Sequence, residues 1–572
     1  MITKSAQTSR SRSGSGSLSV GGLCATAAAV WGIGAAIHYH RLGLTLAHYD
    51  ARAHLVVARR VFDSLTPGWQ QVGGVWLPLP HLLNAIPVQI DWFYRTGYSA
   101  IAISIGSMAL AAWAMARLME RATGSWAGGA VTAALLMINP DVVYLQSTPM
   151  TEPLLFGTTF LAVALIAEWS ANLQPVPPPS SLHPPASRFA GLACIAAILT
   201  RYEAFPIVAA AIALSFVVLV RRGFGAVAAL RAVRGLALWP AWALAAFLVN
   251  SKVSVGSWFV SGGFFVAENP ALGDPWLAWT QIWEGLVRLS GSVMPWMAVL
   301  SAIGIIVACF LPAHDRMAST SSRKETLLIV LALAASVALP LYAYYQGHPV
   351  RVRYAVPLVA ACAAIVGSAV ALLHRRVQAV AGMIAVALAL SQVRPFDRQA
   401  PVVVESQREA TNQAGRRAVT AYLSQHWDGQ PILMSMGSLG HYMHDLSAAG
   451  FAIKDFLHEG NGEIWKYAVL HPAPVAAWIA IEERAEGGDA LDWQAKHDPR
   501  FLRDYVRVAE GGGVGLYRRT NEGRRARSEA RGAKVEERGT APFFERRTSN
   551  LETRASRLAP PASRLARNAR RR

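Results

Sequence analysis

Charged residues are scarce in this sequence, and the fingerprints of common soluble enzymes are missing. Only 16% of the 572 residues are charged, whereas 53% are hydrophobic and the mean hydropathy is +0.29. The chain has no phosphate-binding P-loop, no dinucleotide-binding glycine pattern and no Ser/His/Asp order of a hydrolase. These absences argue against an ordinary globular enzyme and direct attention to the long apolar runs.

Cysteine is also rare, which excludes a disulfide scaffold. The four cysteines have no metal-type spacing, and each falls inside an apolar run: Cys24, Cys194, Cys309 and Cys362. Buried thiols of this kind usually act as small apolar fillers. We therefore expect no disulfides.

The apolar runs are long enough to predict about eleven membrane spans. They cover 20–38, 99–116, 125–140, 153–169, 189–200, 204–220, 235–250, 292–311, 326–343, 354–373 and 377–393. Lys and Arg gather in alternate connections, for example Arg117 with Arg121 and Arg375 with Arg376. The positive-inside rule then places the N-terminus in the cytoplasm, and an odd number of spans places the C-terminal region outside.

This pattern predicts an α-helical polytopic membrane protein with a soluble α/β domain. We divide it into a polar cytoplasmic leader (1–19), a transmembrane domain (20–393), an outer-face α/β domain (394–519) and a disordered Arg-rich tail (520–572). An outer loop at 39–98 carries interfacial helices. The tail from 521 onward holds 14 Arg and one Lys against six Glu, so it supplies +9 of the net charge of +19. Because about half of the net positive charge lies in this tail, the charge balance does not point to a nucleic-acid partner, and we expect none.

Six charged residues interrupt the apolar pattern on the predicted outer side. They are Asp50, Glu152, Arg201, Glu203, Arg351 and Arg353. Charge at a membrane boundary is costly unless it has a partner or a function. A pair of outer arginines also breaks the positive-inside pattern and suits a phosphate ligand, which binds Arg through charge-assisted bonds. The sequence thus predicts a polar site on the outer face.

Several of the candidate residues also have a purely structural interpretation. Asp50 starts an apolar-periodic segment and could be only a helix N-cap, with His54 one turn later on the same face. Arg201 and Glu203 could simply pair with each other. Trp76, in the motif Trp76–Leu83 with its two prolines, could be an interfacial anchor.

In their order and common side, these motifs resemble the membrane glycosyltransferases of the GT-C superfamily, nearest to glycosyltransferase family 39. That family includes protein O-mannosyltransferases and bacterial lipid A aminoarabinose transferases. The resemblance covers roughly 20–395 and is carried by short motifs: Tyr49-Asp50, Trp76–Leu83, Thr151-Glu152-Pro153, Arg201-Tyr202-Glu203 and Arg351–Pro357.

The resemblance implies an enzyme that moves a sugar from a polyprenyl-phosphate donor to a lipid, glycan or protein acceptor, with inversion, at the outer (periplasmic) face of the cell (inner) membrane. It implies Asp50 as the general base, and Glu152 as a second catalytic residue that orients the base, binds a metal ion or holds an arginine in place. Phosphate or donor contacts then come from Arg201, Arg351 and Arg353 with Glu203, and acceptor or sugar contacts from Tyr49, His54, Trp76 and His81. One Asp and one Glu leave open whether a divalent metal ion takes part.

Two positions depart from the protein O-mannosyltransferases. Those enzymes carry an Asp-Glu pair in the first loop, whereas Ala51 follows Asp50 here, and Trp76 replaces the histidine common before the proline motif. A different class remains open: a transporter or flippase for a lipid-linked or anionic substrate. A transporter should carry charges near the middle of the bilayer and internal repeats, and the span-end charges here favour the enzyme.

After Arg394 the pattern changes to that of a soluble domain. The periodicity predicts a helix at Ala414–His426, strands at Pro431–Met436 and Val475–Ile481, and a closing hairpin of Tyr505–Ala509 with Val514–Arg518. The turn at 437–440 opens a short helix and can cradle an anion, although a lone turn of this kind is usually only a turn.

Overall fold

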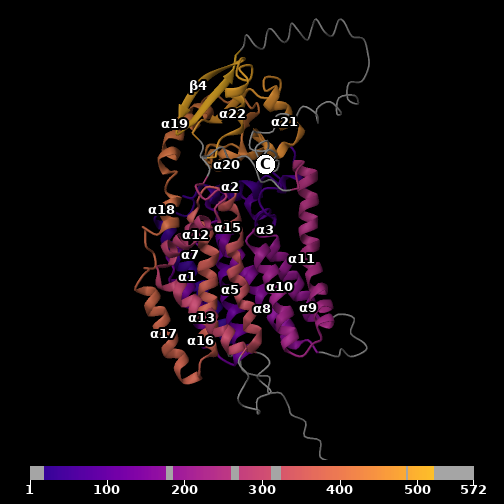
Figure 1. Cartoon of the computed structure of the whole chain (residues 1–572). Helices are drawn as coiled ribbons and strands as arrows, with labels where there is room; N and C mark the ends of the chain where they lie inside the picture. Colours follow the sequence, from indigo (N-terminus) through magenta and orange to yellow (C-terminus); the bar gives the residue numbers. More distant parts are fainter. Residues whose placement is uncertain (1–18, 175–184, 259–268, 311–323, 485–486, 521–572) are drawn as a thin grey trace, which may run out of the picture.

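In this computed structural model the protein combines a long helical bundle with a smaller mixed α/β domain at one end (Figure 1). The structure describes residues 19–174, 185–258, 269–310, 324–484 and 487–520. Apart from Ser19 and Thr520, the predicted leader and Arg-rich tail lie outside the described residues. The predicted fold class, a polytopic helical protein with a C-terminal α/β domain, is confirmed.

Among the described residues, eight helical segments of the bundle are long and apolar enough to cross a membrane. They are α1 (Val20–Arg41), α5 (Tyr98–Thr123), α8 (Glu152–Asn172), α10 (Ala204–Arg221), α11 (Ala226–Val255), α13 (Val293–Phe310), η3 with α15 (Glu325–Val337 and Ala338–Tyr345), and η4 with α16 (Val352–Ala355 and Val356–Leu372). Three further predicted spans form the shorter helices α6 (Ala127–Ile138), α9 (Pro185–Ile198) and α17 (Arg375–Leu390). The chain is thus a multi-pass membrane protein, and the count of eleven spans stays a prediction.

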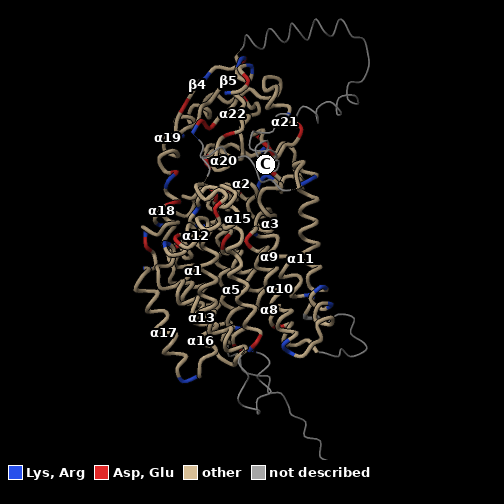
Figure 2. Tube along the Cα trace, viewed as in Figure 1, with Lys and Arg blue, Asp and Glu red and all other residues tan. Residues whose placement is uncertain are grey.

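Small residues let the central helices approach closely. A Cβ on Gly129 of α6 would lie 2.3 Å from the Cα of Ala116 in α5, and one on Gly128 would lie 2.4 Å from the carbonyl oxygen of Gly367 in α16. Only glycine permits backbones to pack at such distances, a common device between membrane helices. Figure 2 shows that charged residues gather near the ends of the bundle and in the α/β domain, with few between.

Short elements lie between the bundle and the α/β domain. They are α2 (Tyr49–Arg59), η1 (Trp69–Val72), α3 (Leu79–Asn84), η2 (Pro87–Gln89), α4 (Asp91–Thr96), α7 (Pro140–Leu145), α12 (Pro275–Ser290) and α18 (Pro401–Ser406). Helix α3 exposes Leu82 and Leu83, as an interfacial helix does. The apolar stripe of α2 behaves differently, because Leu55 and Ala58 are buried inside the protein rather than turned outward.

The α/β domain is a five-stranded sheet with helices around it. Its elements are α19 (Ala410–His426), β1 (Ile432–Met434), α20 (Met436–Leu446), β2 (Phe456–Leu457), α21 (Glu463–Leu470), β3 (Trp478–Glu482), α22 (Ala490–His497), β4 (Tyr505–Gly511) and β5 (Val514–Arg519), with the short 3-10 helices η5 (Ser447–Ala449), η6 (Ile453–Asp455) and η7 (Glu459–Asn461). The strand order is β2-β1-β3-β5-β4, with β1 parallel to β2 and β3 and the closing hairpin antiparallel. The predicted helix, two strands and hairpin are all present within a few residues.

The glycine-rich turn after β1 binds a carboxylate of the protein itself, that of Glu459. The carboxylate of Glu459 accepts hydrogen bonds from the backbone N–H of Met436 at 2.7 Å and from the hydroxyl of Ser435 at 2.5 Å. A carboxylate at a helix N-terminus satisfies unpaired N–H groups and the helix dipole. The turn is therefore a cap for α20.

Candidate functional site

The predicted outer charges converge where the helical bundle meets the elements beneath the α/β domain. We call five of them the outer-face cluster: Asp50, Glu152, Arg201, Glu203 and Arg353. They come from the first turn of α2, the start of α8, the turn between α9 and α10, and η4. Asp50 and Arg353 are 303 residues apart in the chain, yet they form an ion pair.

Asp50 is not the N-cap of its helix. His48 occupies that position and its Nδ1 accepts the backbone N–H of Asp50 at 3.1 Å. The Asp50 carboxylate is free of capping and instead contacts the Nη2 of Arg353. The structural interpretation of Asp50 as a cap is therefore wrong, and its side chain belongs to the site.

The Asp50 carboxyl is held in its ionised form. Burial alone raises the pKa of a carboxyl group, because a low-dielectric environment disfavours charge. Here the facing Arg353 guanidinium opposes burial, and the pKa of Asp50 lies well below its usual range. The residue is 9% exposed, so this carboxylate is nearly removed from water.

Arg353 has more hydrogen-bonding capacity than its protein partners use. One nitrogen of the guanidinium meets Asp50, while Nε and Nη1 are buried without a hydrogen-bond partner among the described residues. Each unpaired buried donor costs free energy, and a guanidinium presents five donors in a rigid fork. An anionic ligand with several acceptor oxygens fits this arrangement.

Arg201 joins the two glutamates of the cluster. Its Nη2 lies 2.6 Å from Glu203, its Nη1 lies 3.1 Å from Glu152, and Nη1 also donates to the hydroxyl of Thr151 at 2.9 Å. The expected Arg201–Glu203 pair is thus present, but it forms part of a larger network. Glu152 is fully buried, and neither of its oxygens accepts a well-oriented hydrogen bond from the described residues.

Two histidines beside the cluster have a defined tautomer. His81 Nδ1 lies 3.2 Å from the carbonyl oxygen of Leu77, which can only accept, so His81 carries its proton there. Its Nε2 then accepts from His54 Nδ1 at 3.0 Å. His54 is left with a bare Nε2 that no described residue binds.

The electrostatic environment keeps His54 neutral. Burial is the main cause, Asp50 opposes it, and the cations Arg201 and Arg353 add to it, so that the pKa of His54 is lowered to about 3. The influence of both arginines also shows how near the histidine lies to the outer-face cluster. A neutral His54 can accept a hydrogen bond from a hydroxyl group but cannot supply positive charge.

Each of the two aromatic candidates packs against a histidine. Trp76 packs on His54 with ring centroids 4.1 Å apart, and on His81 at 5.8 Å. Tyr49 contacts His48 at 4.7 Å. A pocket next to the cluster is lined by polar and apolar side chains that include His54, His81, Asn84, Ser104, Thr151 and Leu154.

Arg351 lies apart from the other predicted phosphate ligands. It lines a second pocket together with α12 residues Gln281 and Arg288, and its backbone N–H and carbonyl both bond the hydroxyl of Tyr344. The two arginines of one motif thus face different spaces, although only Val352 separates them in the chain.

Sequence reasoning missed two buried groups of the site, His48 and Glu405. Glu405, in α18, lies 3.9 Å from His48 Nε2, and both of its oxygens are buried without a hydrogen bond from the described residues. Burial raises the pKa of Glu405, although Arg353 and Arg351 oppose it. The signal that could have found it is a single acid after the apolar run at 402–404.

Within the described ranges, no group of three or more His, Cys, Asp and Glu side chains is arranged to hold a metal ion. The arrangement that is present combines a buried carboxylate, a partly unsatisfied arginine and neutral histidines. It can bind an anion and accept a proton beside it.

Comparison with known proteins finds similar solved structures but no similar curated sequence or family model. No protein-family model and no curated protein sequence matches the chain. Two crystal structures of ArnT from Cupriavidus metallidurans are similar, one in the apo state and one bound to undecaprenyl phosphate. The identities are 13% and 14% and the TM-scores 0.42 and 0.40, over 86% of this chain and 98% of each ArnT chain. Likeness at this level does not by itself establish an activity.

Proposed function

We propose that the chain is an integral membrane glycosyltransferase that moves a sugar from a polyprenyl-phosphate-linked donor to an acceptor at the outer face of the membrane. One observation carries this proposal. A buried carboxylate, Asp50, faces an arginine, Arg353, whose two other donor nitrogens are buried and unpaired among the described residues. A base and an anion-binding group therefore meet at one point near the ends of apolar helices.

The donor phosphate binds at Arg353. Phosphate oxygens accept hydrogen bonds from Nε or Nη1, which lie on different edges of the guanidinium, and charge-assisted bonds of this kind are about twice as strong as neutral ones. Arg201 lies in the same cluster and adds positive charge, while Glu152 and Glu203 fix its guanidinium. These cations stabilise the negative charge that develops on the phosphate as the sugar leaves.

Asp50 acts as the general base. The acceptor hydroxyl gives its proton to the carboxylate as its oxygen forms a bond to the anomeric carbon. The bond from that carbon to the phosphate oxygen breaks, and the phosphate leaves with the electron pair. Attack from the side opposite the leaving group inverts the anomeric configuration.

Donor binding also makes Asp50 a better base. In the free protein Arg353 holds the pKa of Asp50 low. A phosphate on Arg353 shares that positive charge, so the carboxylate regains affinity for a proton. His54 supports the step by accepting a hydrogen bond from the acceptor or sugar at its bare Nε2.

The test is sugar transfer by the purified protein in lipid nanodiscs. A panel of radiolabelled polyprenyl-phosphate sugars is offered with extracted envelope lipids and glycans as acceptors. The proposal expects one donor class to be consumed and the product to have the opposite anomeric configuration. Product with retained configuration contradicts the mechanism, and lipid translocation without transfer across the panel supports a flippase instead.

A further inference from the structure

Helix α2, which carries Asp50, belongs to two hydrophobic cores at once. Ala51, in its first turn, packs with the membrane helices. Leu55 and Val56, in the next turn, pack in a separate cluster with residues of the α/β domain such as Leu439 and Trp478. Helix α2 therefore packs against both the membrane helices and the α/β domain, and Asp50 lies in the turn of α2 that contacts the membrane helices.

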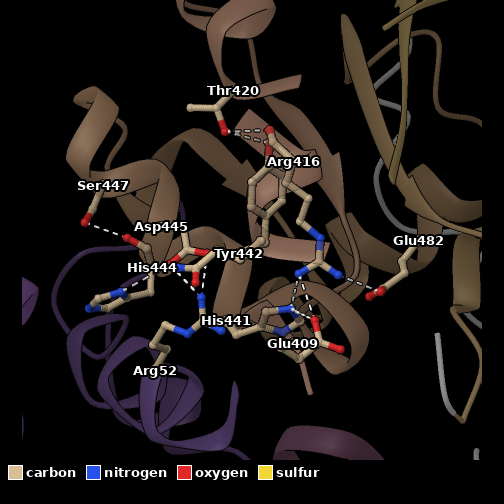
Figure 3. A network of polar contacts seen from close by, with 11 residues as sticks. Arg52, Glu409, Arg416, Thr420, His441, Tyr442, His444, Asp445, Ser447 and Glu482 are labelled. Atoms are coloured by element: carbon tan, nitrogen blue, oxygen red, sulfur yellow. Dashed lines mark hydrogen bonds and ion pairs between the residues drawn. The ribbon is translucent and has the colours of Figure 1, made fainter. Parts of the chain in front are cut away.

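A buried ion pair fixes the α/β side of this helix. The Nη1 of Arg52 lies 2.8 and 2.6 Å from the two carboxylate oxygens of Asp445 in α20 (Figure 3). Arg52 is 1% exposed, and Gln413 of α19 adds a further hydrogen bond to Asp445 at 3.3 Å. Residues two apart on a helix point in different directions. Asp50 thus meets Arg353 of the bundle while Arg52 meets the α/β domain.

The rest of the outer loop is held by the same domain. The carboxylate of Asp63 accepts the backbone N–H of Ile453 at 3.2 Å and of Lys454 at 3.1 Å. Gln71 donates to the carbonyl of Gly460 at 2.8 Å. These contacts pin the segment after α2 and leave the helix little freedom to turn.

We propose that the α/β domain positions the general base, with Arg52 and Asp445 as positioning residues that act on Asp50 through α2. The inference rests on the proposed function for its catalytic part. It assigns the domain a place inside the catalytic machinery in addition to any contact it makes with the acceptor.

The physical reason is the precision that proton transfer demands. A carboxylate displaced by about 1 Å from the reacting hydroxyl can cost roughly 100-fold in rate. Asp445→Asn keeps the side-chain shape but removes the charge that compensates Arg52. The buried guanidinium of Arg52 then lacks its compensating charge, and the first turn of α2 is displaced or becomes less ordered.

The first experiment tests, without any substrate, whether the α/β domain holds α2 in place. Hydrogen exchange of residues 49–59 is measured in the full chain in nanodiscs for the wild type, Asp445→Asn and Asp492→Asn. Asp492 is a matched control, because its carboxylate pairs only with exposed Lys496 of its own helix at 2.6 Å. Faster exchange of 49–59 in Asp445→Asn alone is expected. Unchanged exchange overturns the inference.

The second experiment reads catalysis. In Asp445→Asn the inference expects kcat to fall by up to about 100-fold with KM for the donor unchanged, because only the base is displaced. Arg52→Lys keeps the charge with one donor group and is expected to give an intermediate kcat. An unchanged kcat, or a change in KM alone, contradicts the positioning role.

The two readouts separate the two proposals. If the wild type transfers no sugar, the proposed function fails, and the exchange experiment still decides whether the domain holds α2. If Asp445→Asn does not yield folded protein, the milder Arg52→Lys serves for both measurements.

Discussion

The outer-face cluster and the contacts of Arg416 in the α/β domain differ in how completely their buried charges are paired. The outer-face cluster leaves both oxygens of Glu152 and two nitrogens of Arg353 without hydrogen bonds from the described residues. In the α/β domain, Arg416 is 1% exposed and bonds Glu409, Glu482 and His441, and only its Nε lacks a partner (Figure 3). A satisfied network specifies a fold, whereas an unsatisfied one is a place for a ligand.

The largest effect on stability is expected in the satisfied network. Arg416→Met leaves the buried Glu482 and the partly exposed Glu409 without their cation, and breaking a buried pair in this way costs about 3–5 kcal/mol. The free energy of unfolding of the α/β domain, measured by pulse proteolysis in urea, should fall by that amount. The control is Arg500→Gln, since Arg500 is exposed and pairs only with Asp498. Equal effects of the two changes would remove the distinction between the networks.

The stability of the α/β domain is also expected to depend on pH, because the Arg416 network contains a buried carboxyl group. Burial raises the pKa of Glu482 from 4.5 to about 7, although Arg416 opposes it. Between those values the folded state binds a proton that the unfolded state has released, so stability falls as pH rises. The shift corresponds to about 3 kcal/mol over this range.

The measurement is the free energy of unfolding of the α/β domain at several pH values from 4.5 to about 7. Glu482→Gln should flatten this part of the profile relative to the wild type. A slope that persists in the variant would show that another group is responsible.

A smaller effect is expected for ligand binding at the outer-face cluster. Arg353→Lys retains the charge but loses the fork of donors, and a lost hydrogen bond to a charged group costs about 1.5–3 kcal/mol. The Kd for polyprenyl phosphate should rise roughly tenfold to a hundredfold, measured by titration in nanodiscs. Arg117→Lys is the control, because Arg117 pairs with Glu168 at the other end of α5 and α8. Equal affinity in both variants would place the phosphate elsewhere.

The smallest effect concerns the histidine pair. His81→Phe removes the acceptor that fixes the proton of His54 on Nδ1, a neutral hydrogen bond of about 0.5–1.5 kcal/mol. We expect kcat to fall about tenfold or less, and the ¹⁵N signals of the His54 ring to show a mixture of tautomers. A single unchanged tautomer in the variant would mean that another group orients His54.

The sequence predicted the bundle, and it singled out five charged residues that the structure brings together, for identifiable reasons. Span length is a one-dimensional property, so the apolar runs were visible directly. Arg201 and Glu203 are near neighbours in the chain, and their pairing needed no tertiary knowledge. Asp50 was marked by its place at the start of a helix beside a span.

What the sequence could not predict depends on contacts between distant segments. Nothing local indicates that Asp50 faces Arg353 but not Arg351, because the backbone, with Arg351 extended and Arg353 in the 3-10 helix η4, decides where each guanidinium lies. The apolar stripe of α2 suggested a membrane interface, and the structure places it against the α/β domain. An amphipathic pattern predicts that the apolar face of a helix is buried, but it does not predict whether lipid or another part of the protein buries it.

The most direct test of the account is the rate of sugar transfer by wild type and Asp50→Asn, with Asp492→Asn as the control. All three are assayed with the same radiolabelled polyprenyl-phosphate sugar in nanodiscs, and binding of unlabelled polyprenyl phosphate is measured in parallel. The account predicts that Asp50→Asn loses about 100- to 10,000-fold in rate while still binding the lipid phosphate, and that Asp492→Asn behaves as the wild type. Transfer at the wild-type rate by Asp50→Asn would contradict the assignment of the base.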